Sequence, residues 1–504
     1  MKNFYVPDKH KGRTGYQIMP DRFYRPPEDN KLPHIPFRII KDWDDVEPNW
    51  KPDIDLEFRN RYFYGGNLHG ITAKLDFIKK MGFNLIYINP IYWTEEYHHY
   101  DVEDHLKIDP YLGSMNDLQK MIRQAHQKGI LIILDMVFNH MNITSGYYQE
   151  MLAGDHKYKN WFIQGQTWRE FENLRECNKQ NPDYIEYACS IGEIYAMQGV
   201  DGFRMDLGEC FPIEFMEAFC KRVKAINPDI LIVNERWDYA SDEYGNYYDF
   251  ADTVMNYRAT DGIGLWVRTG NFKHLNYVFS RLALYPKEVQ DSMWNHTDSH
   301  DTPRAMTLIS GKGMNEEPCF SRLWDIEGPF HHDEDFFTYE FRKWEAEQKY
   351  NIGVEQLKRN KKLLKIYMLL MYSIKGIPMT FSGTELGIVG YKDPDNRSPY
   401  PWHIINQIER GFRNEIFQFV CSLGKYRNSN LDILRTGDMP LPIADDSVCK
   451  VVRSSTDGTI EVLVNRTNQV QKTNMKYPLG EILLSSNDGN GDYLEPYGYL
   501  VHRF

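Results

Sequence analysis

The chain has 504 residues and a formal net charge of −12 at pH 7. This length allows more than one domain. The acidic balance argues against a nucleic-acid partner, because binding to a phosphate backbone needs a basic face. No segment has the run of about 18 apolar residues that a membrane helix requires, so we expect no membrane partner. The seven cysteines follow no metal or disulfide pattern, which predicts a reducing compartment and a cytoplasmic protein.

Strand-like apolar runs alternate with amphipathic helical patterns along most of the chain. The expected strands span 16–19, 84–89, 130–135, 202–207, 230–235, 253–256, 292–295 and 377–381. Helical patterns between the earlier strands span 68–78, 114–125, 184–197 and 215–226. Continuous apolar strands joined by helices indicate a parallel sheet covered on both faces. Eight such units favour an α/β fold of the (β/α)₈ TIM-barrel type.

The domain organisation follows from changes in this pattern. We expect the catalytic barrel over residues 1–427, with a short subdomain-like loop at 141–180 after the third strand. An insertion rich in acidic and aromatic residues, 311–350, follows the seventh strand. From 428 to 504, short alternating runs separated by Asp-Gly and Pro-Tyr-Gly turns predict an antiparallel β-sandwich domain.

Two charged residues interrupt the fourth apolar strand. Arg204 and Asp206 are two positions apart, so their side chains point to the same face of the strand. A buried charge is costly unless it is paired. Because barrel active sites lie at the carboxyl ends of the strands, we expect this pair to belong to a site there. Arg204 is expected to lower the pKa of Asp206 and to keep it ionised.

Two more carboxylates follow the ends of other strands. Glu235 ends the fifth strand and Asp301 follows the seventh, so both can share one rim with Asp206. Glycoside hydrolysis needs one ionised and one protonated carboxyl group, and Glu235, near Trp237, is the candidate for the protonated one. Ordinary strand-end ion pairs are the structural alternative. Three coordinated strand ends favour the catalytic interpretation.

Short motifs at the same strand ends point to a known family. DMVFNH (135–140), GFRMD (202–206), NERWD (234–238) and HDT (300–302) resemble the four short motifs of the α-amylase family of glycoside hydrolases, family 13. YQIMPDRF (16–23), FYGGNL (63–68) and DPDNR (393–397) are similar to the neopullulanase, cyclomaltodextrinase and maltogenic amylase group. The resemblance implies a barrel enzyme that cleaves α-1,4 bonds of maltooligosaccharides, cyclodextrins, starch or pullulan, with an α-glucan as partner and the oligomeric state left open.

The resemblance also implies a retaining mechanism and a role for each matching residue. Asp206 corresponds to the nucleophile, which forms a covalent glucosyl intermediate. Glu235 corresponds to the general acid/base, and Asp301 to a carboxylate that holds sugar hydroxyls. Arg204 corresponds to the residue that orients the nucleophile. The residues matching positions around the sugar in subsite −1 are the donors His140, His300 and His98, the aromatic platform Tyr100, and the pair Asp393 and Arg397.

Other positions depart from the family pattern. Gly208-Glu209-Cys210 stands where many relatives have other residues, and Asn234 stands where glycine is common. Asn139 corresponds to a calcium ligand of many α-amylases, but calcium needs six to eight oxygen ligands and no complete set is visible. We therefore expect no required cofactor and no metal site. Ca²⁺ is the one ion that the resemblance suggests, but a complete ligand set for it is missing from the sequence. The alternatives to the hydrolase are a 4-α-glucanotransferase, an α-1,6-acting glucosidase and, more distantly, a non-catalytic carbohydrate-binding relative.

Overall fold

The computed structural model describes residues 6–29, 31–43, 60–169, 171–242, 245–310, 354–390, 393–473, 480–486 and 491–504. The insertion expected at 311–350 lies outside these residues. None of the helices in the described part combines the length and the apolar character that a membrane span requires.

The centre of the molecule is a parallel sheet of eight strands that closes into a barrel. Its strands are β1 (Gly15–Ile18), β4 (Leu85–Ile88), β7 (Leu131–Met136), β11 (Gly202–Met205), β12 (Leu231–Asn234), β15 (Thr253–Val254), β16 (Trp294–His296) and β17 (Ile377–Phe381). Their spatial order is β15-β12-β11-β7-β4-β1-β17-β16, and a parallel bridge between Met255 and Trp294 joins the two edges. The predicted (β/α)₈ barrel is confirmed.

The barrel strands are buried on both faces. In β4, Leu85 and Tyr87 face the barrel interior, while Ile86 and Ile88 pack against the surrounding helices. This two-sided burial explains why the strands are continuous apolar runs rather than alternating ones.

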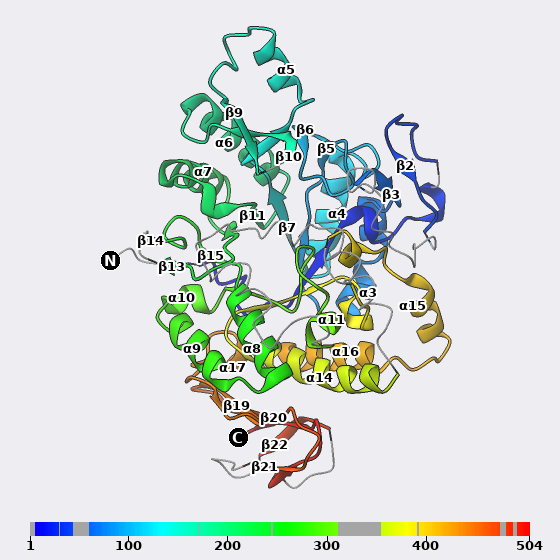
Figure 1. The fold of residues 1–504 in the computed structure, drawn as a ribbon, viewed down its shortest axis with the longest axis vertical. Helices are drawn as coiled ribbons and strands as arrows, with labels where there is room; N and C mark the ends of the chain where they lie inside the picture. Colours follow the sequence, from blue (N-terminus) through cyan, green and yellow to red (C-terminus); the bar gives the residue numbers. More distant parts are fainter. Residues whose placement is uncertain are drawn as a thin grey trace.

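Helices surround the barrel and connect its strands (Figure 1). They are α2 (Leu68–Ala73), α3 (Leu75–Lys80), α4 (Met115–Gln127), α6 (Pro182–Met197), α7 (Ile213–Ile226), α8 (Tyr257–Thr269), α9 (Phe272–Leu282), α10 (Lys287–Gln290), α11 (Ala305–Ser310), α14 (Val354–Ser373), α15 (Trp402–Glu409), α16 (Glu415–Ser429) and α17 (Leu431–Leu434). The helix expected at 68–78 is interrupted at Lys74, which ends α2 and precedes α3. A capping box of Ser114 and Asp117 fixes the start of α4.

An excursion after the third barrel strand forms a small sheet at the upper end of Figure 1. It contains β8 (His140–Asn142), α5 (Gly146–Leu152), β9 (Phe162–Trp168) and β10 (Phe171–Cys177), with strand order β8-β10-β9. Because β8 begins at His140, this sheet is anchored directly to the end of β7. The other short strands are β2 (Ile39–Ile40), β3 (Tyr62–Phe63), β5 (Tyr92–Thr94), β6 (Val102–Ile108), β13 (Ser241–Asp242) and β14 (Gly245–Asn246).

An antiparallel β unit follows the barrel and lies at the lower end of Figure 1. Its main sheet has the order β18 (Ile443–Ala444), β19 (Val448–Ser455), β20 (Gly458–Asn465), β24 (Tyr499–Arg503) and β22 (Glu481–Ser485), and β21 (Gln471–Lys472) pairs with β23 (Tyr493–Leu494). The main sheet packs against α14 and α16. Buried Arg453 on β19 donates to the carbonyl of Ser373 at the end of α14, which ties the unit to the barrel helices.

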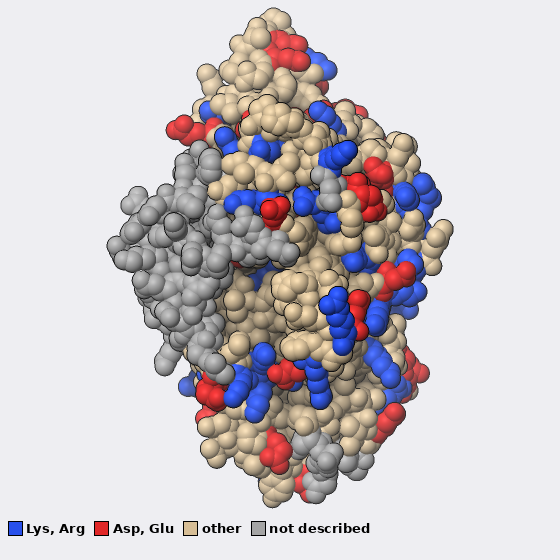
Figure 2. Space-filling model, turned by 90° about the vertical axis from the view of Figure 1, so that its right-hand side faces the viewer, with Lys and Arg blue, Asp and Glu red and all other residues tan. Residues whose placement is uncertain are grey.

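The surface seen in Figure 2 carries acidic and basic side chains in an interspersed arrangement. In the described part of that face, no broad area has basic groups alone. This face therefore lacks the continuous basic surface that binding to a phosphate backbone requires.

Candidate active site

Arg204 lies at the centre of a group of buried carboxylates at the carboxyl ends of neighbouring strands. Its Nη1 is 2.8 Å from Asp135 Oδ1 and 2.7 Å from Asp206 Oδ1, and its Nη2 is 3.0 Å from Glu235 Oε2. Because β11 lies between β7 and β12, Arg204 can reach a carboxylate on either side. The side chains of Arg204 and Asp206 do face the same way, as the period of the strand predicts.

The electrostatic balance at Asp206 differs from the sequence prediction. Burial raises the pKa of Asp206 well above its ordinary value, and Glu235, Asp135 and Asp301 add to this effect. Arg204 lowers the pKa as expected, but its effect is outweighed. The expectation that Arg204 alone keeps Asp206 ionised was therefore wrong, because one cation is shared among several buried acids.

Glu235 is held by a backbone donor and by an indole. Leu207 N donates to its Oε2 at 2.6 Å, and Trp237 Nε1 donates to its Oε1 at 2.9 Å. Leu207 adopts a left-handed backbone with φ of 51°, which is uncommon for a residue with a side chain and turns its N–H toward Glu235. The Trp237 ring stacks on Tyr257, with centroids 4.1 Å apart and an interplanar angle of 2°. Both oxygens of Glu235 therefore have fixed directions.

Asp301 lies in a second charged group, formed with the loop after β17. Arg397 Nη2 is 3.0 Å from Asp301 Oδ1, and Arg397 Nη1 is 2.9 Å from Asp393 Oδ1. His300 Nε2 is 3.1 Å from Asp301 Oδ2. The Arg397 side chain also donates through Nε to the His300 carbonyl at 2.8 Å, so the arginine holds both His300 and Asp301 of the HDT motif.

Tyr100 connects the two charged groups. Its hydroxyl donates to Asp135 Oδ2 at 2.7 Å and lies 2.6 Å from His300 Nε2. The Tyr100 and His300 rings are nearly parallel, with centroids 5.3 Å apart. His140 Nε2 lies 3.0 Å from the Tyr100 carbonyl oxygen. Burial lowers the pKa of His140 to about 3, so this ring is neutral and donates one hydrogen bond at a time.

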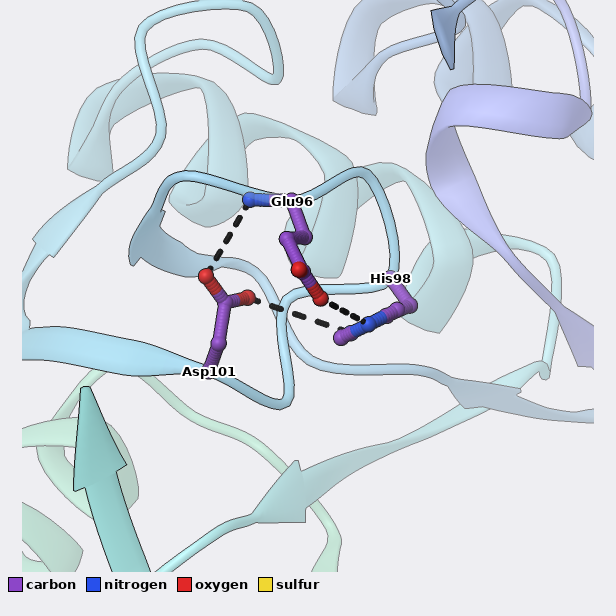
Figure 3. A group of neighbouring side chains, drawn as sticks. All are labelled: Glu96, His98 and Asp101. Atoms are coloured by element: carbon purple, nitrogen blue, oxygen red, sulfur yellow. Dashed lines mark hydrogen bonds and ion pairs between the residues drawn. The ribbon is translucent and has the colours of Figure 1, made fainter. Parts of the chain in front are cut away.

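His98 is on the segment between β5 and β6, and Figure 3 shows its side chain close to those of Glu96 and Asp101. Its Nε2 is 2.6 Å from Glu96 Oε2, and its Nδ1 accepts a hydrogen bond from Tyr100 N at 3.0 Å. Through these contacts all the site residues predicted from the sequence belong to one connected network.

Sequence reasoning left three residues of this network out of the site. Asp135 accepts from Arg204, Tyr100 and Tyr87, and Gln17 donates to Asn89 and lies 2.8 Å from His300 Nδ1. Asn89 in turn donates to the Tyr100 hydroxyl at 2.8 Å. All three are polar residues in or directly after buried barrel strands, and that pattern is the signal that could have identified them.

Comparison with known proteins places this network in a family. The family model described as alpha amylase, catalytic domain, matches residues 17–323. The chain belongs to the alpha-amylase family. A cyclomaltodextrinase from Geobacillus thermopakistaniensis is 26% identical, with 99% of this chain and 78% of that protein covered. Neopullulanase 2 from Thermoactinomyces vulgaris is 27% identical, with 94% and 73% covered.

Solved structures share the fold of this alpha-amylase family enzyme. The type III pullulan hydrolase from Thermococcus kodakarensis has a TM-score of 0.77 at 23% identity, covering 99% of this chain and 83% of that one. A cyclic α-maltosyl-(1→6)-maltose hydrolase from Arthrobacter globiformis has a TM-score of 0.74 at 23% identity, covering 99% and 100%. The chain is thus a glycoside hydrolase of this family with a barrel and a C-terminal β unit.

Asn139, the position that corresponds to a calcium ligand of many α-amylases, does not suit calcium in this chain. Asn139 Oδ1 accepts from Lys179 Nζ at 2.6 Å, and the same ammonium is 2.8 Å from Glu176 Oε1. An ammonium group thus takes the oxygen that a divalent cation would need. Among the described residues, Asn139 therefore does not offer the free oxygen that calcium requires there.

Gly208 and Glu209, shortly after Asp206, are in close contact with residues at the end of β12 and directly after it. A Cβ at Gly208 would lie 2.2 Å from Asn234 Oδ1, so the absence of a side chain at 208 makes room for the amide at 234. Next to it, Glu209 Oε2 is 2.5 Å from Arg236 Nη1. The guanidinium of Arg236 lies 4.1 Å from the ring centre of Tyr247. These contacts lie just beyond Asp206, at the positions where the sequence was expected to depart from the family pattern.

The charges around Asp301 predict that the pH profile of kcat/KM shifts in opposite directions in two variants. Burial raises the pKa of Asp301 to about 7, Arg397 lowers it, and Asp393 raises it. Removing a cation makes a carboxyl group hold its proton to higher pH. We therefore expect the acidic limb of kcat/KM, which reports groups of the free enzyme, to move up by roughly one pH unit in Arg397→Gln and down in Asp393→Asn.

The measurement is a pH profile of kcat/KM on maltotriose for both variants. Asp395→Asn on the same loop is the control, with no shift expected. Movement of the limb in the same direction in both variants would contradict the assignment of this limb to Asp301.

Proposed function

We propose that this enzyme hydrolyses α-1,4-glucosidic bonds of maltooligosaccharides, cyclodextrins, starch or pullulan with retention of the anomeric configuration. The names of its relatives support this range, since they include cyclomaltodextrinase, neopullulanase and maltogenic alpha-amylase. Structural neighbours have been solved with maltose and with acarbose. In this proposal residues 1–427 form the catalytic unit and 428–504 an accessory β domain.

The arrangement of Asp206 and Glu235 is the observation that carries the proposal. The two carboxylates lie on the two terminal nitrogens of one guanidinium, that of Arg204. Retaining enzymes need two carboxyl groups closer together than inverting enzymes, which leave room for a water molecule between acid and base. One arginine holding both groups is consistent with the closer spacing.

Each carboxylate then has a distinct role. Asp206 attacks the anomeric carbon as Glu235 gives its proton to the leaving oxygen, so the glycosidic bond breaks and an Asp206–glucosyl ester forms. Glu235 next takes a proton from water, whose oxygen attacks the same carbon and releases Asp206. Because several buried carboxylates share Arg204, they titrate as one coupled group, and the first step uses the state in which Asp206 is ionised and Glu235 carries the proton.

The surrounding residues position the sugar. Asp301, held by Arg397, accepts hydrogen bonds from sugar hydroxyls in this proposal. On substrate binding, His140, His300 and His98 exchange hydrogen bonds that they make within the site for hydrogen bonds to sugar hydroxyls, and Tyr100 provides a ring face for the sugar. Asp393 fixes Arg397 through its ion pair and acts through that residue.

The experiment is a product profile on maltotriose, a cyclodextrin, pullulan and starch. The proposal expects glucose and maltose from maltotriose and panose from pullulan, with the α-anomer released first by NMR. Products longer than maltotriose would favour the 4-α-glucanotransferase. Maltotriose from pullulan would favour the α-1,6-acting enzyme, and the absence of any product would favour the non-catalytic relative.

A further inference from the structure

The cluster of Glu96, His98 and Asp101 has one oxygen that the fold leaves without a partner. Asp101 Oδ2 accepts from Glu95 N, Glu96 N and Asn142 Nδ2, at 3.0, 3.2 and 3.1 Å. Its Oδ1 is buried and accepts no hydrogen bond from any residue that the structure describes. Such an orphaned buried carboxylate oxygen is costly, and it points to a ligand.

This oxygen is directed at an imidazole nitrogen at a distance too long for a hydrogen bond. Asp101 Oδ1 and His98 Nδ1 are 3.8 Å apart (Figure 3). Two ligand atoms that each lie about 2.1 Å from a zinc ion are at most about 4.2 Å apart. The observed separation is within that limit, so one ion reaches both atoms once Nδ1 gives up the hydrogen bond from Tyr100 N.

Glu96 already holds His98 in the form that binds a metal. Its carboxylate is 2.6 Å from His98 Nε2, while His98 Nδ1 accepts from Tyr100 N, so these bonds assign the ring proton to Nε2. A carboxylate on the outer nitrogen is the usual support for a metal-bound histidine. One ligand atom from each of the three residues lies within 4.8 Å of the others.

We propose that Glu96, His98 and Asp101 form an inhibitory site for a divalent ion of the Zn²⁺ class. His98 Nδ1 and Asp101 Oδ1 bind the ion, Glu96 fixes the imidazole, and water completes the coordination. Imidazole nitrogen together with carboxylate favours zinc over the all-oxygen ligand sets of Ca²⁺ and Mg²⁺. The side chains of His98 and Glu96 are 12% and 13% exposed, so the cluster is in contact with solvent on that side.

Occupation of this site opposes sugar binding. The ion takes the lone pair of His98 Nδ1, which otherwise accepts from Tyr100 N–H, so this hydrogen bond is lost and the backbone at Tyr100 must shift. It also withdraws His98 from the substrate. This inhibition rests on the proposed function, whereas binding of the ion does not.

The test is calorimetric titration of metal-free protein with ZnCl₂, followed by turnover of maltotriose in the presence of zinc. We expect one site in the native chain, and a dissociation constant that rises roughly 10- to 100-fold in Glu96→Gln. Asp101→Asn removes a direct ligand and should abolish binding at the same concentrations. Glu95→Gln, on the same loop but outside the cluster, is the matched control and should bind like the native chain.

An anomalous zinc peak between His98 Nδ1 and Asp101 Oδ1 in crystals would support the site directly. No binding by the native chain, or equal binding by all variants, would overturn the proposal. If Asp101→Asn fails to fold, zinc binding by Glu96→Gln and the anomalous zinc peak still test whether the site exists. Zinc binding without loss of turnover would overturn the inhibitory role. If the chain binds zinc but is inactive on every α-glucan, the metal site is supported and the proposed function is contradicted.

Discussion

Replacing Asp206 by asparagine is expected to lower the turnover of maltotriose by at least about 10⁴-fold, because the amide cannot form the glucosyl ester. Stability should not fall. Burial raises the pKa of Asp206 above that of an exposed aspartate, so this group costs folding free energy when it is ionised. That cost is absent below the unfolded pKa and increases as the pH rises toward the folded pKa. The neutral variant is therefore expected to unfold at the same or a higher temperature at pH 7.

The measurements are turnover and calorimetric unfolding of the same preparation. Asp252→Asn is a matched control, since Asp252 is also buried and paired, 2.8 Å from Lys224, but precedes β15 at the amino end of the strand. Burial raises the pKa of Asp252 as well, so this variant should likewise keep its unfolding temperature at pH 7, but unlike Asp206→Asn it should keep its turnover. Appreciable turnover by Asp206→Asn would exclude Asp206 as the nucleophile.

Replacing Arg204 by methionine is expected to lower the free energy of unfolding strongly. Arg204 is fully buried and is the shared partner of Asp135, Asp206 and Glu235. Removing one member of a buried ion pair costs about 3–5 kcal/mol, because the remaining charge stays uncompensated. The carboxylates left behind take up protons more readily. The loss of stability relative to the native chain should therefore shrink as the pH falls from 7 to 5.

Arg204→Lys separates charge from geometry. Lysine keeps the cation but presents one ammonium group in place of the planar fork that contacts Asp206 and Glu235 through different nitrogens. We expect most of the stability to remain, while turnover falls about 10²-fold from misplacement of the carboxylates. Calorimetry and turnover at both pH values measure these effects. Equal stability of the methionine variant and the native chain at pH 7 would contradict the role of Arg204 as the shared cation.

The sequence was sufficient to predict the barrel, and the residues that it nominated for the site lie in one connected network. Two-sided burial makes each barrel strand a continuous apolar run, and that pattern is visible without coordinates. Polar residues such as His140 and Asp206 at strand ends then identify the rim that carries the chemistry. The short motifs added the proposed role of each residue.

Properties that depend on several strands at once could not be predicted. The pKa of Asp206 reflects burial and carboxylates from other barrel strands, whereas the sequence shows only its neighbour Arg204. Lys179 is remote from Asn139 along the chain, so its occupation of the amide oxygen becomes visible only in the structure. The 3.8 Å spacing between His98 and Asp101 likewise depends on how their loop folds.

The fit between Gly208 and Asn234 makes the effect of a substitution at one position depend on the residue at the other. A Cβ added at 208 would lie 2.2 Å from Asn234 Oδ1, so the amide of Asn234 has to rotate before position 208 can carry a side chain. Because Asn234 Nδ2 donates to the Tyr247 carbonyl oxygen, that rotation breaks a hydrogen bond. The cost of Gly208→Ala should therefore be smaller in a chain with glycine at 234, and the two changes should not be additive.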